Sequence, residues 1–417
     1  MIVAAPGFAF DQAQESAVET VMPLVKQAYI FLHENPELGK AETKAAAFLR
    51  GQLQSLGITD IQSVPNLSTA VIAVLDTGKP GPTVALRAEM DARPLEAGME
   101  EPSDHHPRSL VPGRMHNCGH DAHAAMLLGA AAYIKQNAEL FNGKFVFVFQ
   151  PAEEIAGGAD DIVKDGILKR LGVQAMFAQH VTPEMPVGSL AISPGPSLAG
   201  SSYFKLKLKG RGSHAAAPHE GDDIPLLATR FVEELSYFPA RHLDIASRQV
   251  LVSVAKINAA GPASNVLPAE AEISGTIRAF ENVQVGPHGS PSLAASLEDL
   301  VSRLSHAYGI AYEWELKAGA PPTVNDVDLF RRIVPALQQQ WPGQIDQTQS
   351  RGMFAEDFAY YTADTPSLYF SLGIAKDGKG TGNLHSTDFT LSPDALPLGV
   401  KALISIAKAA DEIQSHQ

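Results

Sequence analysis

Residues 144–154 read KFVFVFQPAEE, a strongly β-forming run that leads through proline and alanine into two adjacent glutamates. A second apolar run, VQAMFAQH at 173–180, ends in a histidine. Strands that are apolar on both faces are typical of an α/β sheet covered by helices on both sides. The stretch therefore predicts an α/β fold with polar residues placed where its strands end.

Helical and extended segments alternate on either side of this stretch. Helical spacing of apolar residues predicts helices at 18–32, 41–57, 121–136 and 326–340, and from about 392 onward. Extended runs predict further strands at 68–76, 82–91 and 367–373. We therefore expect a mixed sheet with helices on both faces, built from residues 1–196 and 319–417.

The middle of the chain has a different pattern. Residues 201–213, SSYFKLKLKGRGS, alternate between apolar and polar side chains, as a strand with one wet face does. Helical runs at 224–237 and 292–308 accompany this strand and others like it. We expect a small α+β sandwich at about 197–318, inserted into the first domain as a lid.

The composition excludes several classes of protein. The 417 residues include 46 acidic and 32 basic ones, with a net charge of −14 and no Lys/Arg cluster, so we expect no nucleic-acid partner. No apolar stretch approaches the ~20 residues of a membrane helix, so we expect no membrane span. The single cysteine cannot form an intramolecular disulfide. A single cysteine and a start without the pattern of a secretory leader favour a cytoplasmic protein. The alternative is an exported chain whose leader has been removed.

Polar clusters stand where the predicted strands end. Asp91 ends one strand, Glu153 and Glu154 follow the next, and His180 ends a third. Residues 116–123, HNCGHDAH, hold three of the 14 histidines and the only cysteine. Because the carboxyl ends of parallel strands meet at one edge of a sheet, we expect these side chains to form one site.

These residue types suit a divalent metal. Two adjacent carboxylates after an apolar strand need a cation to offset their repulsion. Thiolate, imidazole and carboxylate together are a ligand set for zinc or a similar ion, and a neighbouring glutamate could take a proton from water. Each cluster alone has a common structural explanation. Cys118 could instead be a nucleophile, although a histidine two positions away is awkwardly placed as its base.

Nine segments of the chain resemble those of a known family. In order they read LHENPELGKAE, LRAEMDARP, MHNCGHDAHAAMLLGAA, FVFQPAEEIAGGA, FAQHVTPEMPVG, GRGSHAAAPH, ASNVLPAEAEISGTIRAF, AEDFAYY and LHSTDF. They resemble the motifs of the M20 metallopeptidases, and most closely the amidohydrolase branch, which includes hippurate, auxin-conjugate and other N-acyl-amino-acid hydrolases. The resemblance runs from about residue 30 to 400.

The resemblance implies a catalytic α/β domain with a two-metal site and an inserted lid domain that often dimerises. It assigns the metal ligands to Cys118, His120, Glu154, His180 and His385. It makes Glu153 the general base. Zinc or manganese is the expected metal, with cobalt or nickel as alternatives. Asp91 resembles an aspartate that orients a ligand imidazole, and a structural salt bridge is the alternative.

The lid motifs imply residues that bind substrate. His214 resembles a histidine that reaches the active site, in many members from the partner subunit, and polarises the scissile carbonyl. Asn265 and Arg278 resemble positions that hold the substrate's carboxylate. Two residues depart from the branch, which usually has aspartate in place of Glu89 and leucine in place of Arg93. The arginine puts an unexpected charge near the entrance and leaves substrate preference open.

We therefore expect metal-dependent hydrolysis of the amide bond of small N-acyl or N-aroyl amino acids. The enzyme would be a homodimer or higher homo-oligomer formed through the lid. The nearest alternative is a dipeptidase or carboxypeptidase on the same scaffold. A non-enzymatic metal-binding protein and a thiol amidase are rivals from other classes, and chelators distinguish the thiol enzyme because it would survive them.

Overall fold

The computed structural model describes residues 12–286, 290–340, 345–348 and 351–413. The chain divides into two compact units. The first comprises residues 1–197, 324–350 and 360–417, and the second comprises 198–323 and 351–359. The division differs from the predicted one mainly in the segment 351–359, which groups with the second unit.

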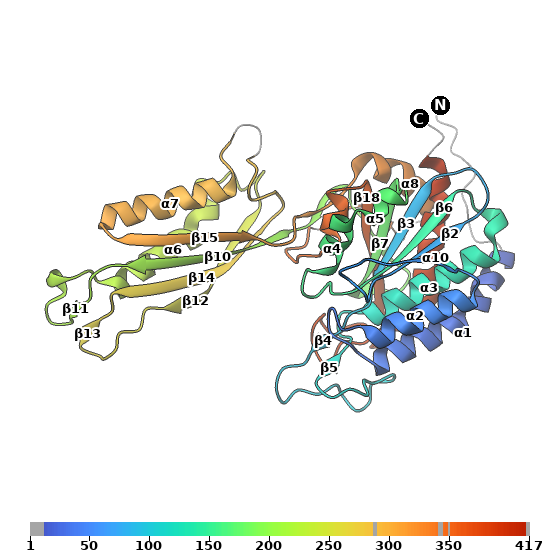
Figure 1. Cartoon of the computed structure of the whole chain (residues 1–417), viewed down its shortest axis with the longest axis horizontal. Coiled ribbons are helices and arrows are strands. Elements are labelled where there is room, and N and C mark those ends of the chain that lie inside the picture. Colours follow the sequence, from blue (N-terminus) through green and yellow to red (C-terminus); the bar gives the residue numbers. More distant parts are fainter. Residues whose placement is uncertain (1–11, 287–289, 341–344, 349–350, 414–417) are drawn as a thin grey trace. The chain divides into compact units, whose positions relative to one another are not determined.

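The first unit is built on a mixed sheet of eight strands in the order β1-β2-β6-β3-β7-β18-β8-β17 (Figure 1). In that order the strands are Asp60–Gln62, Val71–Asp76, Lys144–Gln150, Thr83–Glu89, Ala175–Pro186, Ser367–Ala375, Leu190–Ala191 and Ile345–Asp346. β6, β3, β7 and β18 run parallel to one another, whereas β2 is antiparallel to β6. A short hairpin of β4 (Arg93–Pro94) and β5 (Arg114–Met115) lies outside this sheet.

Helices cover this sheet because its central strands are apolar on both faces. The helices are α1 Gln12–Glu34, α2 Thr43–Ser55, α3 His120–Gln136, α4 Gly158–Asp165, α5 Ile167–Arg170, α8 Val327–Gln340, α9 Ala359–Thr362 and α10 Ala395–Ala409. In β6, Phe145, Phe147 and Phe149 join the core shared with α1, α3 and α10, whereas the buried Val146 and Val148 face the other side. The predicted fold class and the predicted helices of this unit are confirmed.

Helix α3 is the central helix of this unit. It packs against α1 and α10 as well as against β3 (Figure 1), and its residues from His120 to Ile134 are all buried. Its many alanines let neighbouring helices approach closely, since a small side chain takes little room. The first turn of this rigid helix carries part of the HNCGHDAH cluster.

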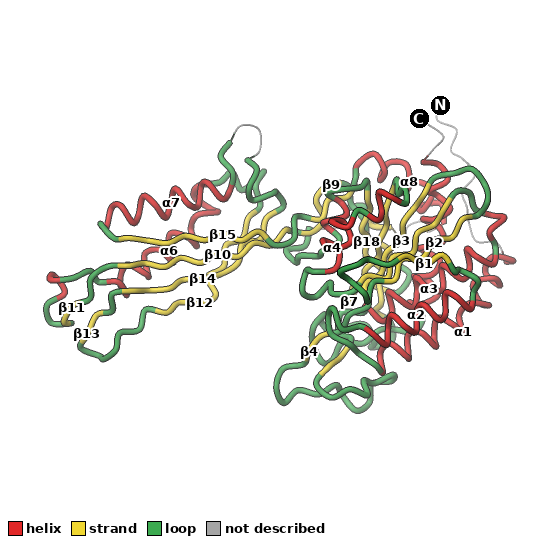
Figure 2. The backbone as a smooth tube through the Cα atoms, in the orientation of Figure 1, coloured by secondary structure: helices red, strands yellow, loops and turns green. Residues whose placement is uncertain are grey.

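The second unit is a four-stranded antiparallel sheet with two helices (Figure 2). The strand order is β12 Val250–Asn258, β14 Glu270–Ala279, β10 Gly200–Lys209 and β15 Ala311–Ala318, and the helices are α6 Ile224–His242 and α7 Leu293–Tyr308. Phe204, Leu206 and Leu208 of β10 are buried in a core of their own with α6 and α7. The predicted alternation of β10 is confirmed.

Short strands complete the second unit and its connections. β11 (Ser213–His214) pairs with β13 (Val266–Leu267). The chain leaves the first unit at β9 (Gly195–Leu198) and returns at β16 (Thr323–Asn325).

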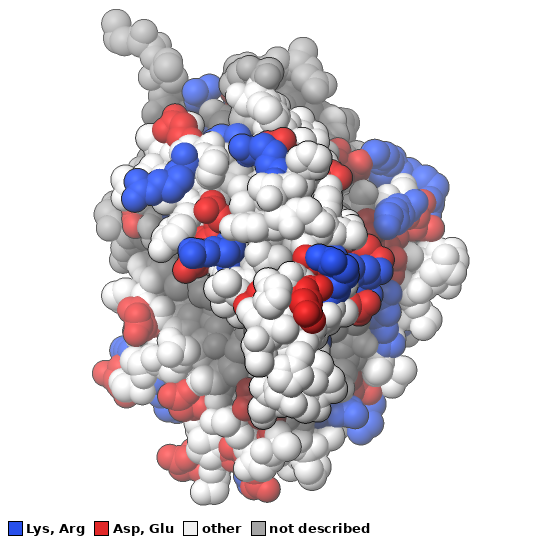
Figure 3. Space-filling view, turned by 90° about the vertical axis from the view of Figure 1, so that its left-hand side faces the viewer, with Lys and Arg blue, Asp and Glu red and all other residues white. Residues whose placement is uncertain are grey.

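On the face seen in Figure 3, Lys and Arg side chains are interspersed with Asp and Glu. Within the described ranges, none of the helices combines the length and apolar character that a bilayer-spanning segment needs.

Candidate metal centre

The candidate site lies at the carboxyl ends of β6 and β3 and beside the middle of β7, because β7 continues past His180 to Pro186 and His180 does not end its strand as expected. Glu153 and Glu154 follow β6, and Asp91 follows β3, the next strand of the sheet. β7 pairs with β3 as far as Ala178, and His180 comes two residues later. This edge of a parallel sheet is where α/β proteins form their sites.

A glycine turn brings the HNCGHDAH cluster to the same edge. Gly119 has a φ of 86°, and a Cβ at this position would lie 2.3 Å from Cγ2 of Val181. Both facts require glycine, since other residues rarely adopt this φ and no side chain fits. The turn starts α3 directly at His120 and leaves Cys118 on its other side, so both side chains reach the strand ends.

The structure brings the five predicted ligands and the predicted base together. Three groups have ligand atoms that all lie within 4.8 Å of one another: Cys118, His120 and His180; Cys118, Glu154 and His385; and His120, Glu153 and Glu154. Each group shares one residue with each of the others. The groups therefore form one continuous cluster, and its ligand atoms can be divided into more than one set around a metal ion.

Backbone carbonyls set the tautomers of two of these histidines. The Nδ1–H of His120 donates to the carbonyl oxygen of Asp91 at 2.9 Å, and that of His180 donates to the carbonyl of Val181 at 2.7 Å. Because a carbonyl only accepts, Nδ1 carries the proton in both rings, which leaves Nε2 to bind metal once that nitrogen is unprotonated. Burial lowers the pKa of His120, but Cys118 and Asp91 outweigh burial and hold that pKa well above its usual value, so a metal must displace a proton from this ring. His180 Nε2 lies 3.5 Å from Sγ of Cys118. Burial and the neighbouring His123 lower the pKa of His180 to about 3, so this ring is neutral.

Asp91 holds the turn that carries the two glutamates. Its Oδ1 accepts the amide N–H of Glu153 at 3.1 Å and its Oδ2 accepts that of Glu154 at 3.0 Å. Oδ1 also lies 3.3 Å from Nδ1 of His120, next to the carbonyl bond already described. Asp91 therefore contacts a candidate ligand imidazole, as the resemblance implied, and it also fixes the backbone of the glutamate pair.

The residues present fit a divalent cation. His120 Nε2 and Glu154 Oε1 are buried and have no hydrogen-bond partner among the described residues. Unpartnered buried polar atoms are costly, and a cation between a lone pair and a carboxylate would satisfy both. Burial also raises the pKa of the Cys118 thiol, so a thiolate there needs a positive charge beside it. Nitrogen, sulfur and oxygen donors together suit zinc and similar ions.

His385 comes from the loop before α10 and has an unusual backbone. Its φ is 70°, and its N–H donates to the carbonyl of Asn117 at 2.7 Å, which ties this loop to the glycine turn. Its Nε2 lies 3.5 Å from Oε1 of Glu154. The other oxygen of Glu154, Oε2, accepts a hydrogen bond from the guanidinium of Arg93. The ion pair between Arg93 and Glu154 could not be predicted from the sequence.

A series of buried polar contacts links β3, α3 and β7 next to the candidate site. Glu89 pairs with Arg87 and accepts Nδ1–H of His123 at 2.8 Å, while Nε2 of His123 accepts the amide of Val181 at 2.9 Å. All three side chains are buried. The additional methylene of Glu89, relative to the usual aspartate, lengthens the side chain that spans from β3 to α3.

His33 is a buried residue that the sequence analysis missed. Its Nδ1 lies 2.6 Å from Oδ2 of Asp121 and its Nε2 lies 2.9 Å from Oε1 of Glu101. Burial alone would lower its pKa, but the two carboxylates outweigh burial and raise the pKa to about 10. The segment LHENPELG, one of those that resemble the family, contains this histidine.

The second unit places the predicted substrate residues at two separate ends. The carbonyl of Asn265 accepts the amide of Ala215, so Asn265 is close to His214 beside the β11–β13 pair. Arg278 pairs with Ser201 at the opposite end of the β10–β14 ladder, which is roughly 30 Å long. The structure therefore brings His214 and Asn265 together but not Arg278.

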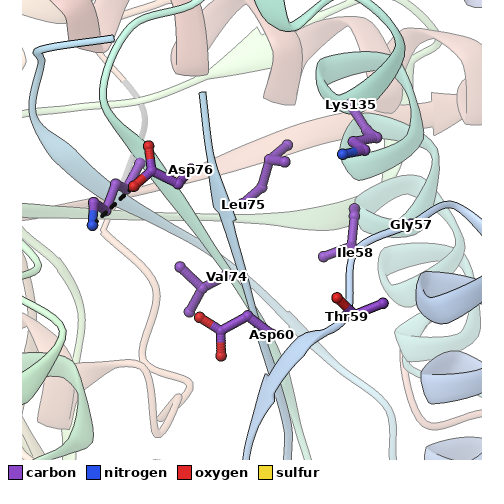
Figure 4. Close-up of a pocket in the computed structure, with 9 residues that line it drawn as sticks. Gly57, Ile58, Thr59, Asp60, Val74, Leu75, Asp76 and Lys135 are labelled. Carbon is purple, nitrogen blue, oxygen red and sulfur yellow. Dashed lines mark ion pairs between the residues drawn. The ribbon is translucent and has the colours of Figure 1, made fainter. Parts of the chain in front are cut away.

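A further hollow lies at the opposite edge of the first sheet (Figure 4). Its lining includes Asp60, Asp76, Lys135 and Lys144, and Asp76 and Lys144 form an ion pair of 3.0 Å. Lys144 begins β6, whereas the candidate centre follows the end of that strand. The hollow is therefore separate from the candidate centre.

Comparison with known proteins agrees with this geometry. The model of peptidase family M20/M25/M40 matches residues 85–409. The chain belongs to the M20 peptidases. The predicted family is thereby confirmed, and the protein is a hydrolase.

Individual M20 relatives resemble nearly the whole chain. An IAA-amino acid hydrolase of Arabidopsis thaliana is 36% identical over 383 residues, which cover 90% of this chain and 83% of the relative. A thermostable carboxypeptidase of Saccharolobus solfataricus is 34% identical over 376 residues, covering 89% of this chain and 91% of the relative. The crystal structure of a dinuclear metal-binding M20 peptidase from Bacillus subtilis has 28% identity and a TM-score of 0.78, covering 94% and 98%.

Proposed function

We propose that this M20 hydrolase is a dinuclear metal-dependent amidohydrolase. It would cleave the amide bond of N-acyl or N-aroyl amino acids and release a carboxylic acid and a free amino acid. The observation that carries the proposal is the cluster of candidate ligands around His120 Nε2 and Glu154 Oε1, two buried atoms for which the described residues supply no hydrogen bond. The similarity to an IAA-amino acid hydrolase supports an N-acyl amino acid as the substrate class.

Five side chains would hold the metals, namely Cys118, His120, Glu154, His180 and His385. Zinc or manganese suits this donor set, with cobalt or nickel as alternatives. Divalent ions, when bound, supply Lewis acidity that polarises the scissile carbonyl and makes water more acidic. The similarity to a structure described as dinuclear supports two ions.

Glu153 would be the general base. Its Oε2 lies 3.9 Å from Nε2 of His120, and its backbone is held by Asp91, so the carboxylate faces the cluster from a fixed turn. It would take the proton of the attacking water and give it to the leaving amine. His214 would donate a hydrogen bond to the developing oxyanion.

The lid residues favour a site shared between two copies of the chain. His214 and Asn265 lie near one end of the β10–β14 ladder, which is roughly 30 Å long, and Arg278 lies near the other. No single N-acyl amino acid spans that distance. We therefore infer that, in a homodimer or higher homo-oligomer, one copy supplies His214 and Asn265 and another supplies Arg278 for the substrate's carboxylate.

A carboxypeptidase or dipeptidase is the second candidate function. It is favoured by the 34% identity to the thermostable carboxypeptidase. The same metals and the same base would serve it, and only the group accepted on the acyl side would differ.

A substrate screen with metal-reconstituted enzyme tests the proposal. N-acetyl, N-benzoyl and indole-acetyl amino acids are compared with dipeptides and longer peptides. We expect hydrolysis of the N-acyl substrates that is lost with chelator and restored by Zn²⁺, Mn²⁺ or Co²⁺. Cleavage of peptides alone would favour the carboxypeptidase, and activity that survives chelation would contradict a metal enzyme.

A further inference from the structure

Arg93 makes an ion pair with a candidate metal ligand. It lies on β4, and its Nη1 donates to Oε2 of Glu154. The Glu154 side chain is 8% exposed and that of Arg93 is 31% exposed, so solvent screens the pair only in part. A charged pair that is partly buried acts on its neighbours more strongly than a surface ion pair does.

The two oxygens of Glu154 have different surroundings. Oε2 accepts a hydrogen bond from Arg93, whereas Oε1 has no hydrogen bond within the described part of the chain and lies 3.5 Å from Nε2 of His385. Oε1 is therefore the oxygen available to a cation in the candidate centre. A carboxylate whose second oxygen is bound to arginine cannot chelate an ion with both oxygens.

Arginine also changes the electrostatics of the centre. Its guanidinium stays charged at every physiological pH, and a hydrogen bond from it withdraws negative charge from the carboxylate. A fixed positive charge within a few ångströms repels a dication. In the metal-free protein the same charge offsets the buried negative charge of Glu154, so the arginine stabilises the empty form.

We propose that Arg93 is a positioning residue that confines Glu154 to ligation through Oε1 and lowers the affinity of the centre for divalent cations. The inference rests on the proposed metal centre. It makes Arg93 the internal counter-ion of Glu154, with which an incoming metal must compete.

The experiment measures metal affinity directly on the full-length protein. Binding of Mn²⁺ and Zn²⁺ to the metal-free enzyme is followed by calorimetry in competition with a chelator, for wild type, Arg93→Leu, Arg93→Lys and Arg114→Leu. Arg114 is the matched control, since it lies on the paired strand β5 and the described residues give it no ion pair. Melting temperatures with and without metal are recorded for each protein.

We expect Arg93→Leu to bind metal about tenfold or more tightly, which is the scale on which groups that contact ligands alter metal affinity. Its metal-free form should melt at a lower temperature than wild type, and its rise in melting temperature with metal should be larger. Arg93→Lys should remain close to wild type because it keeps the charge, and Arg114→Leu should be unchanged.

Three results would overturn the inference. Unchanged or weaker binding in Arg93→Leu contradicts it, as does equal tightening in Arg114→Leu. If Arg93→Leu does not fold, Arg93→Gln replaces it, and wild-type affinity there counts equally against the inference. Cys118→Ser distinguishes a failure of the Arg93 inference from a failure of the proposed metal centre. If wild type binds no divalent metal, or if Cys118→Ser binds metal as tightly as wild type does, the proposed metal centre is contradicted as well.

Discussion

Glu153 and Glu154 have different surroundings although they are adjacent in the chain. Glu154 contacts Arg93 with one oxygen and approaches His385 with the other. Glu153 instead lies beside His120, with 12% of its side chain exposed. Because Asp91 holds both backbone amides, each side chain can have its own role without any movement of the turn.

Glu153→Gln tests this division of roles. The glutamine keeps the size of the side chain and the backbone bond to Asp91, but it cannot accept the proton of water. We expect kcat to fall by roughly two orders of magnitude or more, with the metal content, measured by atomic emission, unchanged. Glu154→Gln is the matched comparison and should lose metal. Near-normal turnover in Glu153→Gln would rule out the base.

Only part of the candidate site could be predicted at this scale. Short motifs at strand ends are enough to place a carboxylate pair or a histidine at one edge of a sheet. The contact of Arg93 with Glu154 joins positions 61 apart, and that of His33 with Asp121 joins positions 88 apart. Such contacts depend on the path of loops and on side-chain rotamers, which residue patterns do not encode.

At the scale of the elements, the start of α3 depends on the turn at Gly119. Gly119→Ala would force a Cβ against Val181 and into a left-handed backbone conformation. We expect a loss of roughly 2–5 kcal/mol in the free energy of unfolding, measured by urea denaturation. Gly51→Ala is the control, since a Cβ added to Gly51 inside α2 would meet no packed atom of the described residues within 4 Å, and this substitution should stabilise the protein slightly. Equal stability of the two variants would contradict this view of the turn.

His33 links α1 to α3 and to the loop that carries Glu101, and its charge makes this link sensitive to pH. The pKa of about 10 in the folded protein exceeds the ordinary histidine pKa of 6.5, so the stabilisation is complete below about pH 6.5 and is lost as the pH rises toward 10. We expect stability to fall by a few kcal/mol over this range, seen as a falling urea midpoint.

His33→Gln should remove most of this pH dependence. The variant should be less stable than wild type at pH 6.5 and should approach it near pH 10, because glutamine carries no proton to lose. Parallel curves for the two proteins across the range would show that His33 does not titrate as proposed.

Whole elements could be predicted better than their contacts. The helix expected at 224–237 begins at Ile224 and continues to His242, and the one expected at 292–308 is Leu293–Tyr308. Apolar periodicity marks the faces that pack, which is why the existence and type of long elements follow from sequence. It did not indicate that α6 continues past Pro239, a residue that disfavours a helix interior.

For the whole molecule, the proposed sharing of sites between copies has a direct test. Glu153→Gln and His214→Ala proteins, each inactive, are mixed under conditions that exchange subunits. We expect partial recovery of activity, because one site of the hybrid has both residues intact. Recovery is measured against each variant alone and against a mixture that cannot exchange. No recovery in a demonstrated heterodimer would mean that His214 acts within its own chain or not at all.

At this scale, too, the sequence indicates only part of the organisation. Near residue 200 the strands change from continuously apolar to alternating apolar and polar, and this change marks the inserted unit. A strand buried on both faces is apolar throughout, whereas a strand buried on one face alternates. The segment 351–359 belongs with that unit although it is more than 25 positions beyond the return of the chain at Thr323. It is too short to have a hydrophobic periodicity, so no pattern could assign it.

The left-handed backbone of His385 has a consequence for how this protein could change over generations. A non-glycine residue at a φ of 70° costs about 1 kcal/mol or more, and glycine would relieve that cost while keeping the bond from the amide to Asn117. Selection for thermal stability alone would therefore favour glycine over histidine at position 385. The proposed role of His385 as a metal ligand would explain why histidine and not glycine stands here, and a lineage freed from that role would be expected to replace it early.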